Sequence, residues 1–399
     1  MTPRTPRTNP RTQRTPAPAP VLGPRALGRA TLARQHLLRR ASLSARDAVD
    51  HLVGLQAQNV KPPYYALAAR LDGFAPGDLS TLMRDREVVR MVTMRSTIHT
   101  HTADDALRLR PFVQPARERE IASFRSGLGG VDLDLLARIS RELVEEEPRT
   151  MKQLREALLA HWPDAEPGAL SVAARCLLPL VQVTPRGLWR ESGQVTLTTA
   201  ERWLDRPALP APPAEDVVRR YLAAFGPASV KDMQTWAGVT RLRDAFERLR
   251  SELLTFRDEN GVELFDLPDA PRPDPDTGAP PRLLPEFDNL LLSHADRSRF
   301  VPDAFKGRTW RGNQAYRVLL VDGFVAGVWQ LEERRDGRAV LTVEEFRPLG
   351  RAVRDAVTEE AARLLDVLPN GPAGAATAYD IRFGAVVGAG PSVRGTMTS

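Results

Sequence analysis

Residues 214–267 read AEDVVRRYLAAFGPASVKDMQTWAGVTRLRDAFERLRSELLTFRDENGVELFDL. The first two thirds of this stretch contain three segments whose apolar residues have helical spacing. The last third alternates between apolar and polar residues around Asn260-Gly261, a pair that favours the tight turn of a β-hairpin. The stretch therefore predicts three helices that are closed by a hairpin.

The same order of elements recurs twice upstream. In residues 134–200, three helical segments lead into VQVTPRGLWRESGQVTL, where Pro-Arg-Gly separates two short strands. Residues 27–110 contain helical segments at 27–38, 44–56 and 77–88, followed by VRMVTMRSTIHTHT, whose β-branched residues suit a hairpin. Three helices closed by a hairpin are typical of a winged helix-turn-helix, and repetition favours a tandem array. The alternative is that such short units also occur in other mixed folds.

Changes in composition divide the chain further. Residues 1–24 are rich in Pro, Thr and Arg and have no apolar period, which predicts disorder. Proline-rich stretches at 206–215 and 268–285 predict linkers. The predicted parts are a disordered basic arm at 1–24, winged-helix units at 25–125, 126–206 and 214–267, a Pro-rich linker at 268–285, a β-rich scaffold domain at 286–385 and a flexible tail at 386–399.

The C-terminal part differs from the helical units. Two pairs of strand-like segments surround Asp322-Gly323 and Asp336-Gly337, and both pairs favour tight turns. A helical segment and a last strand-like segment follow. The sequence thus predicts an α+β fold: three tandem winged helix-turn-helix units that a C-terminal β-rich domain scaffolds.

Length and composition limit the class of protein. A chain of 399 residues is too long for one compact core. No run of about 18 apolar residues occurs, so we expect no membrane span, and no apolar segment follows the basic N-terminus as in a secretory signal. The single cysteine, Cys176, excludes an internal disulfide and a cysteine-based zinc site. We expect a cytoplasmic protein.

The net charge of +6 invites a nucleic-acid interpretation. Four arginines of the N-terminal arm supply four of these charges, which leaves +2 for the rest of the chain. Binding to a phosphate backbone requires that basic residues cluster on one face, which a total does not show. Composition alone therefore leaves nucleic-acid binding open.

The stretch GLQAQNVKPP at 54–63 places two glutamines two positions apart, near the end of a helical segment. On a continuing helix, Gln56 and Gln58 would face opposite ways. Lys61 precedes a proline, which disfavours the α-region for Lys61, so we expect the helix to end near Gln56. An extended continuation would turn Gln58 to the same side as Gln56, and both amides would point into one cleft.

Three stretches together resemble the AlkZ/YcaQ family of winged-helix DNA glycosylases: LVGLQAQNVKPPYYALAARL, VRMVTMRSTIHTHTADD and LLPEFDNLLLSHADRSRF. The resemblance covers most of residues 25–385. The diagnostic triplet of the family is Gln-Φ-Gln or Gln-Φ-Asp, where Φ is apolar. Gln56-Ala57-Gln58 has the Gln-Φ-Gln form, with a small apolar centre.

The resemblance implies hydrolysis of the N-glycosidic bond of alkylated purines, chiefly N7-alkylguanine, and also of bulky adducts and interstrand crosslinks. An N7-alkylated guanine is cationic and leaves as a neutral base, so no strong acid is needed. The sugar passes through an oxocarbenium-like transition state, which neutral amides can support by positioning water. On this interpretation Gln56 and Gln58 orient the water and the deoxyribose. The alternative is that they are capping or surface amides.

Further residues are candidates for binding DNA. His99 and His101 share one face of a strand, and a metal site would need a third ligand, so phosphate contact or packing is the preferred interpretation. Tyr65 would stack near an unpaired base, unless it is a core residue. Glu286 and Asp288 resemble an acid pair, but the family resemblance makes their segment structural or cleft-lining. The predicted DNA-binding residues are Lys61, Tyr65, Arg95, His99, Arg186 and Lys231.

We predict double-stranded DNA with alkylated bases as the partner, a monomeric state, and no metal or other cofactor. One competing hypothesis is a winged-helix transcription regulator without catalysis. Another is a non-catalytic protein that binds damaged DNA, since an inactive homologue would keep both glutamines.

Overall fold

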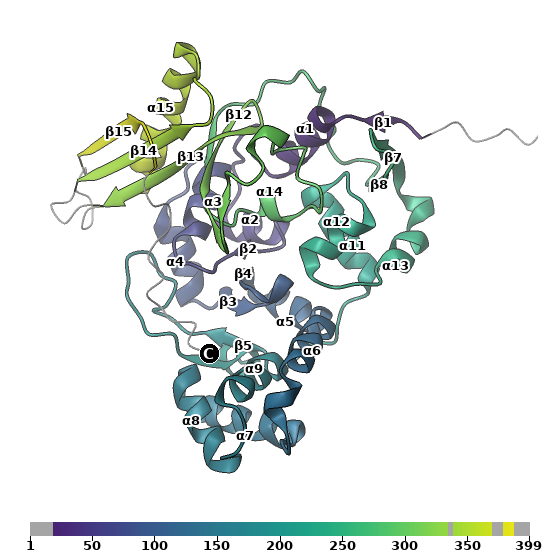
Figure 1. Ribbon diagram of the computed structural model, residues 1–399, viewed down its shortest axis with the longest axis vertical. Coiled ribbons are helices and arrows are strands. Elements are labelled where there is room, and N and C mark those ends of the chain that lie inside the picture. Colours follow the sequence, from purple (N-terminus) through teal and green to yellow (C-terminus); the bar gives the residue numbers. More distant parts are fainter. Residues whose placement is uncertain (1–18, 334–337, 369–377, 387–399) are drawn as a thin grey trace, which may run out of the picture.

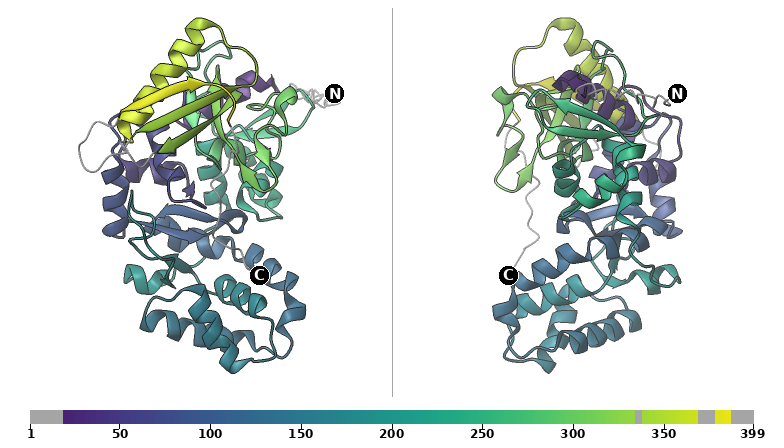
Figure 2. Two further views of the ribbon diagram at one scale, coloured as in Figure 1. Left: turned by 60° about the vertical axis from the view of Figure 1, so that its left-hand side comes forward. Right: turned by 90° about the vertical axis from the view of Figure 1, so that its right-hand side faces the viewer.

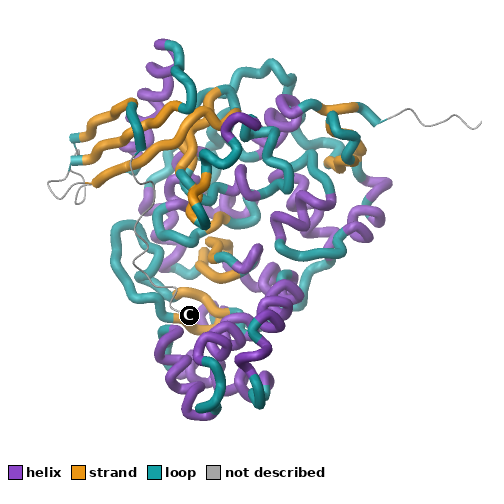
Figure 3. Tube along the Cα trace, viewed as in Figure 1, coloured by secondary structure: helices purple, strands orange, loops and turns teal. Residues whose placement is uncertain are grey.

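A computed structural model describes residues 19–333, 338–368 and 378–386. Helices and several small sheets alternate along the chain, which confirms the predicted α+β class. In Figure 1, residues 133–177 form a helical lobe at the bottom, and a sheet with one long helix lies at the top. Figure 3 shows that the strands form separate groups rather than one large sheet. No helix among the described residues is long and apolar enough to cross a membrane.

Residues 133–199 begin with three helices and end with two antiparallel strands. Before the second helix, Arg149 forms a β-bridge with Leu197 of the last strand. Thr150 then caps that helix, because its hydroxyl accepts a hydrogen bond from the backbone nitrogen of Gln153. The elements are α7 (Leu133–Glu146), α8 (Met151–His161), α9 (Pro167–Leu177), β5 (Leu180–Gln182) and β6 (Leu197–Thr199).

Residues 214–266 repeat this arrangement. A β-bridge joins Ala228, before the second helix, to Phe265 in the last strand. Ser229 and Asp232 form the capping box of that helix. The predicted hairpin is confirmed, with the Asn-Gly pair inside its turn. The elements are α11 (Ala214–Phe225), α12 (Val230–Ala237), α13 (Arg243–Arg248), η3 (Arg250–Glu252), β7 (Leu254–Asp258) and β8 (Glu263–Asp266).

Residues 45–102 have the same order, but their three helices are not the three that were predicted for the first unit. The predicted helix at 27–38 corresponds to α1 (Pro24–Arg34), which precedes these residues, and the predicted helix at 44–56 is shorter than expected. The helix ends at His51 rather than near Gln56, because Val53 and Gly54 both adopt left-handed φ values of 54° and 89°. The chain then enters a short strand. The elements are α2 (Ala45–His51), β2 (Leu55–Gln56), α3 (Pro62–Arg70), α4 (Pro76–Arg84), β3 (Val88–Val92), η1 (Met94–Ser96) and β4 (Ile98–Thr102).

The helix α3 was missed in the sequence. The expectation that Lys61 leaves the α-region is wrong, because its φ and ψ are −74° and −33°. Its carbonyl accepts a hydrogen bond from the backbone nitrogen of Tyr64 at 3.0 Å. Two prolines occupy the first turn of α3, where their missing N–H groups cost no helical hydrogen bond.

In chain order, residues 45–102 are the first repeat, residues 133–199 the second and residues 214–266 the third. The hairpins of the first and second repeats join into one five-stranded sheet, in the order β2-β4-β3-β5-β6. The strands β3 and β5 pair through Arg90 with Gln182 and Met91 with Val181. This central sheet lies between the helical lobe and the rest of the molecule (Figure 1). It carries the triplet Gln56-Ala57-Gln58 at one edge.

The third hairpin pairs with a strand from the predicted disordered arm. Strand β1 (Val21–Leu22) runs parallel to β7, so the prediction of disorder is wrong for these two residues. Residues 1–18 of the arm lie outside the described residues. The next helix, α1 (Pro24–Arg34), also contacts the third repeat, because its Arg34 forms a fully buried ion pair with Asp266.

The remaining helices connect the repeats. Helix α6 packs against α9 and contributes Ile121 to the core of the second repeat, although it precedes the predicted boundary at residue 126. The connecting elements are α5 (Ala103–Phe112), α6 (Gln114–Ser123), η2 (Arg125–Leu128) and α10 (Ala200–Leu204).

The C-terminal part forms a second five-stranded sheet, in the order β15-β14-β13-β12-β9. The predicted turn at Asp322-Gly323 is confirmed, and both residues have left-handed φ values. The predicted Asp336-Gly337 turn and most of the predicted tail, residues 387–399, lie outside the described residues. The elements are β9 (Arg282–Leu284), α14 (Asn289–Leu292), η4 (Asp303–Phe305), β10 (Trp310–Arg311), β11 (Gln314–Ala315), β12 (Arg317–Val321), β13 (Phe324–Glu333), β14 (Ala339–Glu345), α15 (Arg351–Val367) and β15 (Tyr379–Phe383).

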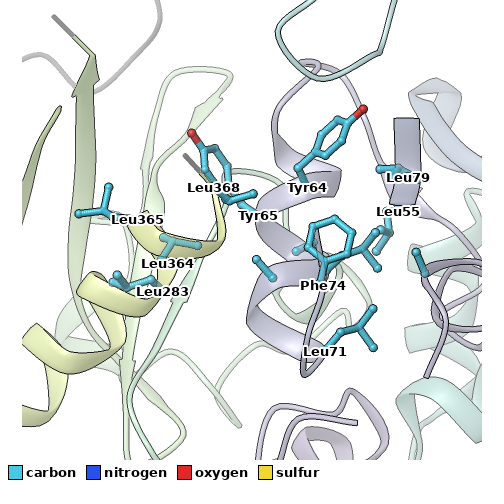
Figure 4. Close-up of a cluster of buried hydrophobic side chains, with 14 of the residues drawn as sticks. Leu55, Tyr64, Tyr65, Leu71, Phe74, Leu79, Leu283, Leu364, Leu365 and Leu368 are labelled. Atoms are coloured by element: carbon cyan, nitrogen blue, oxygen red, sulfur yellow. The ribbon is translucent and has the colours of Figure 1, made fainter. Parts of the chain in front are cut away.

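The C-terminal sheet and the first repeat share one hydrophobic core. Helix α15 lies against this sheet (Figure 2). Strand β9, which occupies the end of the predicted linker, contributes Leu283, and α15 contributes Leu364. Leu55 and Tyr65 of the first repeat belong to the same cluster (Figure 4). The backbone that leads into the triplet is therefore held by the scaffold sheet.

Candidate active site

The triplet lies at the edge of the central sheet. Gln56 is paired with His99 of β4, and the backbone nitrogen of Ala57 donates to the carbonyl of Ile98 at 2.7 Å. The side chain of Ala57 is fully buried, and Arg90 Nη2 donates to its carbonyl at 2.8 Å. Because both peptide groups of the central residue are bonded, the backbone of the triplet has a fixed position.

The two glutamines have different environments. Gln56 is only 6% exposed, whereas Gln58 is exposed. Both side chains contact the β3–β4 turn, which is defined here as residues 93–97 together with the first residue of β4. Gln56 Oε1 accepts from Arg95 Nη2 at 2.8 Å, and Gln58 Oε1 accepts a long hydrogen bond of 3.4 Å from the backbone nitrogen of Ile98. The buried amide is therefore held firmly, and the exposed amide is held weakly.

Arg95 and His99 form a network with Gln56. His99 Nδ1 lies 3.0 Å from the carbonyl of Thr97, so this nitrogen carries the proton and donates. His99 Nε2 is then an acceptor, and Arg95 Nη2 donates to it at 3.2 Å. Burial, followed by the charges of Arg95 and His101, holds the pKa of His99 well below its usual range. His99 is thus neutral and is not a phosphate ligand in this conformation.

The turn that carries Arg95 is strained. Arg95 and the next residue, Ser96, have left-handed φ values of 53° and 58°, which non-glycine residues rarely adopt. Arg95 Nη1 donates to the carbonyl of Trp236 in α12 at 2.5 Å. Gly238 lies so near that a Cβ atom there would be 3.0 Å from the backbone nitrogen of Arg95. The third repeat therefore holds the turn in place.

The segment at 283–300 braces the residues on both sides of the triplet. Asn289 Nδ2 donates to the carbonyl of Gly54 at 2.7 Å, and Asn59 Nδ2 donates to Glu286 Oε1 at 3.1 Å. The other oxygen of Glu286 accepts from Arg317 Nε at 2.7 Å. Burial alone would raise the pKa of Glu286, but the Arg317 charge and its hydrogen bonds outweigh burial and lower it. Glu286 is therefore a fixed acceptor rather than a general acid.

Asp288 has a similarly fixed role. It forms a bidentate ion pair with Arg70, with distances of 2.9 and 2.7 Å, and both side chains are fully buried. The acid-pair interpretation of Glu286 and Asp288 does not hold, because each carboxylate has its own arginine. The segment is structural, as the resemblance implied. Among the described residues, no group of three His, Cys, Asp or Glu side chains is placed to hold a metal ion.

Two predicted DNA-binding residues are engaged within the protein. Lys61 Nζ lies 2.7 Å from both carboxylate oxygens of Glu333, so its ammonium already has an anionic partner. Tyr65 is 1% exposed, packs edge-to-face on Trp329 at 5.6 Å, and has the Arg317 guanidinium 4.9 Å above its ring. The core alternative therefore holds for Tyr65, and its ring does not stack on a base in this conformation.

The other two predicted residues, Lys231 and Arg186, lie on different segments of the chain. Lys231 is exposed in the first turn of α12 and makes no ion pair with a described residue. Arg186 is half-buried in the loop between β5 and β6. Burial and then the Arg186 charge lower the pKa of Arg90 to about 10, so these two guanidinium groups are neighbours. DNA contact by Arg186 and Lys231 stays a prediction.

Sequence reasoning missed Arg90 and Asn289. Arg90 is 2% exposed and has no carboxylate partner among the described residues, although it bonds the centre of the triplet. Its signal in the sequence was a single arginine inside the apolar run VVRMV. Asn289 lay within a stretch that the resemblance used, but its partner Gly54 is 235 residues away.

Comparison with known proteins defines a class and then a family. The class is that of DNA glycosylases, because a family model for such enzymes matches residues 49–367, which include the triplet. The description of that family is "DNA glycosylase AlkZ-like", and since the match covers most of the chain, the chain belongs to the AlkZ-like DNA glycosylase family. This assignment does not favour the transcription-regulator hypothesis.

A curated protein and a solved structure agree with the family. The chain is 25% identical over 363 residues to an "Interstrand DNA cross-link repair glycosylase" from Streptomyces sahachiroi, covering 83% of this chain and 92% of that protein. It is similar in fold to the structure of the Streptomyces sahachiroi DNA glycosylase AlkZ, with a TM-score of 0.75 and 22% identity. That match covers 91% of this chain and 100% of the other.

Proposed function

We propose that this protein is a monofunctional glycosylase that removes alkylated purines, chiefly N7-alkylguanine, from double-stranded DNA. The observation that supports this most directly is the pair of neutral amides at the edge of the central sheet. Gln56 is buried and aligned by Arg95, and Gln58 is exposed two residues further on. Glu286, the carboxylate that Asn59 contacts next to the triplet, is held by Arg317. The site therefore provides orientation rather than a strong acid.

Neutral amides suit a cationic leaving group. Departure of N7-alkylguanine breaks the N-glycosidic bond, and the bonding electron pair neutralises the charged base. Water adds to C1′ of the oxocarbenium-like sugar, releases one proton to solvent and leaves an abasic site. An exposed Gln58 carbonyl can accept a hydrogen bond from that water, because its bond to Ile98 is long. Placement of this kind contributes several kcal/mol to the barrier in enzymes.

The three repeats provide the DNA-binding framework in this proposal. Each has three helices, a bridge or short strand that pairs with the last strand, and a hairpin, which is the order of a winged helix-turn-helix. We propose that the repeats are three tandem winged-helix units and that the protein acts on DNA as a monomer, since one chain supplies both glutamines and their contacts. DNA as a substrate is consistent with the expected cytoplasmic location.

The range of lesions includes larger adducts in this proposal. The curated Streptomyces sahachiroi relative is named for repair of interstrand crosslinks. In this chain Gln58 is exposed, and we propose that the lesion site opens at the surface. An open site admits bulky N7 adducts and crosslinked bases, and we propose these as further substrates.

One incubation tests the core of the proposal. A duplex with a single N7-methylguanine should yield an abasic site in the presence of EDTA, and alkali should then cleave the strand there. A Schiff base is not expected, because the Lys61 ammonium is paired with Glu333. Borohydride should therefore trap no enzyme–DNA adduct. Lack of excision by the purified protein, or trapping through Lys61, would contradict this function.

A further inference from the structure

We propose that Arg95 is a positioning residue that sets the orientation of the Gln56 amide, so that Gln56 presents its N–H groups to the substrate. This inference rests on the proposed glycosylase function. It assigns different roles to the two glutamines: Gln56 donates hydrogen bonds, and Gln58 accepts one from the attacking water. It also replaces the predicted role of Arg95 as a phosphate ligand.

The first step of the argument is the direction of hydrogen bonding. A guanidinium group only donates, so the atom of Gln56 that faces Arg95 Nη2 at 2.8 Å must be the carbonyl oxygen. The amide nitrogen consequently points away from Arg95. It makes no hydrogen bond to any residue that the structure describes, and it remains available as a donor.

The second step concerns how firmly Arg95 is held. Its Nη2 atom is shared between Gln56 and His99, and its Nη1 atom donates to the Trp236 carbonyl. Neutral His99 accepts through Nε2 only because Thr97 fixes the proton on Nδ1. Three acceptors on three different segments thus fix the plane of the guanidinium group more firmly than a single hydrogen bond to a mobile side chain would.

The third step concerns charge. No carboxylate of a described residue lies within ion-pairing distance of Arg95. Burial lowers its pKa to about 10, so it is still a cation at neutral pH. A cation that is surrounded only by neutral acceptors polarises these acceptors more strongly than a cation that is already paired with a carboxylate. Three of the five guanidinium N–H groups of Arg95 are thus committed to Trp236, Gln56 and His99, and a phosphate role that displaced them would break charge-assisted hydrogen bonds.

The experiment compares Arg95→Met with a matched control, Arg119→Ala. Arg119 Nη2 also donates to a carbonyl of the third repeat, that of Gly238 at 2.8 Å, but it does not contact Gln56. The measurement is the single-turnover excision rate on a duplex with one N7-methylguanine, together with DNA affinity. Arg95→Met should lower the rate roughly ten- to a hundredfold, the range for a misplaced catalytic group. Arg119→Ala should leave the rate unchanged.

A double-mutant cycle tests whether Arg95 acts through Gln56. In a Gln56→Ala background, Arg95→Met should cause little additional loss, because the group that it positions is absent. Arg95→Lys should recover part of the rate, because an ammonium group can still donate to the Gln56 carbonyl. If the two losses are additive, or if Arg95→Met lowers DNA affinity in proportion to the rate, Arg95 is a phosphate ligand and the inference fails.

A second variant leaves Arg95 in place, in case Arg95→Met does not fold. Gln56→Glu should pair with Arg95 through its carboxylate and lose the donor, so its rate should fall as far as that of Gln56→Ala. A parental rate for Gln56→Glu would overturn the inference. Failure of the proposed function has a different signature, because the parental protein itself would then release no base.

Discussion

At the scale of single residues, the two glutamines are chemically alike but differently placed, since Gln56 is buried and Gln58 is exposed. We expect Gln56→Ala and Gln58→Ala each to slow single-turnover excision of N7-methylguanine, by roughly ten- to a thousandfold. DNA affinity should change little, because neither side chain carries charge. Gln330→Ala, on the scaffold strand β13, is the matched control and should keep the parental rate. Parental excision by a double Gln56, Gln58 alanine variant would remove the glutamines from the mechanism.

Gln58→Asp tests whether the second amide is only an acceptor. A carboxylate accepts a hydrogen bond from water as well as an amide does, so the variant should keep measurable activity on cationic N7-methylguanine. Hypoxanthine should be a poor substrate for both proteins, because this neutral base must be protonated as it leaves and the triplet contains no acid. The check is excision from two duplexes that differ only in the lesion. Efficient release of hypoxanthine by the parental protein would indicate a general acid that the structure does not reveal.

At the residue scale, the sequence reveals groups that are adjacent in the chain but not partners that are distant in it. The triplet was identified because its residues are adjacent in the chain. Lys61 was predicted to bind DNA, but its partner Glu333 lies 272 residues away, on a strand of the scaffold sheet. The burial of Tyr65 depends on Trp329 and Arg317 of the same sheet. No spacing rule reports such contacts.

At the scale of elements, the order of helices and hairpins in the second and third repeats was predictable, because capping boxes mark their second helices. The first repeat was harder. Its first helix ends at His51, because Val53 takes a left-handed φ that a β-branched residue seldom adopts. Helix α3 begins with two prolines, and such a pair is as typical of a turn as of the start of a helix. The joining of two hairpins into one sheet is a tertiary contact that neither hairpin specifies alone.

The short helix α14 gives a test at this scale, because Asn289 bonds the Gly54 carbonyl two residues before the triplet. Asn289→Ala would leave that carbonyl without its partner, so the variant should lose about 1–3 kcal/mol of stability. Its excision rate should also fall, since Gly54 leads into Gln56. Ser293→Ala is the control, because the Ser293 hydroxyl bonds only within the same segment. Chemical denaturation and single-turnover kinetics measure the two effects, and equal rates for both variants would show that the brace does not position the triplet.

At the scale of the whole molecule, buried histidines couple folding to pH. Burial lowers the pKa of His101 to about 3, with a further contribution from Arg220, and burial likewise lowers that of His294 to about 3. An unfolded histidine titrates near pH 6.5, so below that pH the unfolded state takes up protons that the folded state does not. Stability should therefore be full above pH 6.5 and fall as the pH drops toward 3. The slope approaches about 1.4 kcal/mol per pH unit for each histidine.

Denaturation between pH 7 and 5 measures this loss. His101→Gln should show a shallower dependence than the parental protein, because one of the coupled groups is absent. His161→Gln is the control, since His161 is exposed at the end of α8. A parental slope in His101→Gln would mean that other groups dominate the acid response.

The N-terminal arm sets the last expectation, which concerns how the whole molecule holds DNA. Residues 1–18 contain four arginines and no acidic residue, whereas β1 begins at Val21 and pairs with β7. The carbonyl of Pro20 also accepts from the backbone nitrogen of Arg257, so a truncation should end at Pro18 to preserve this edge.

Loss of up to four phosphate contacts should weaken binding to all duplexes alike and reduce the salt slope by at most about 3.6. The single-turnover rate at saturating enzyme should not change, because the contacts of Gln56 and Gln58 all lie beyond residue 55. Loss of excision at saturation would instead place the arm in the active site.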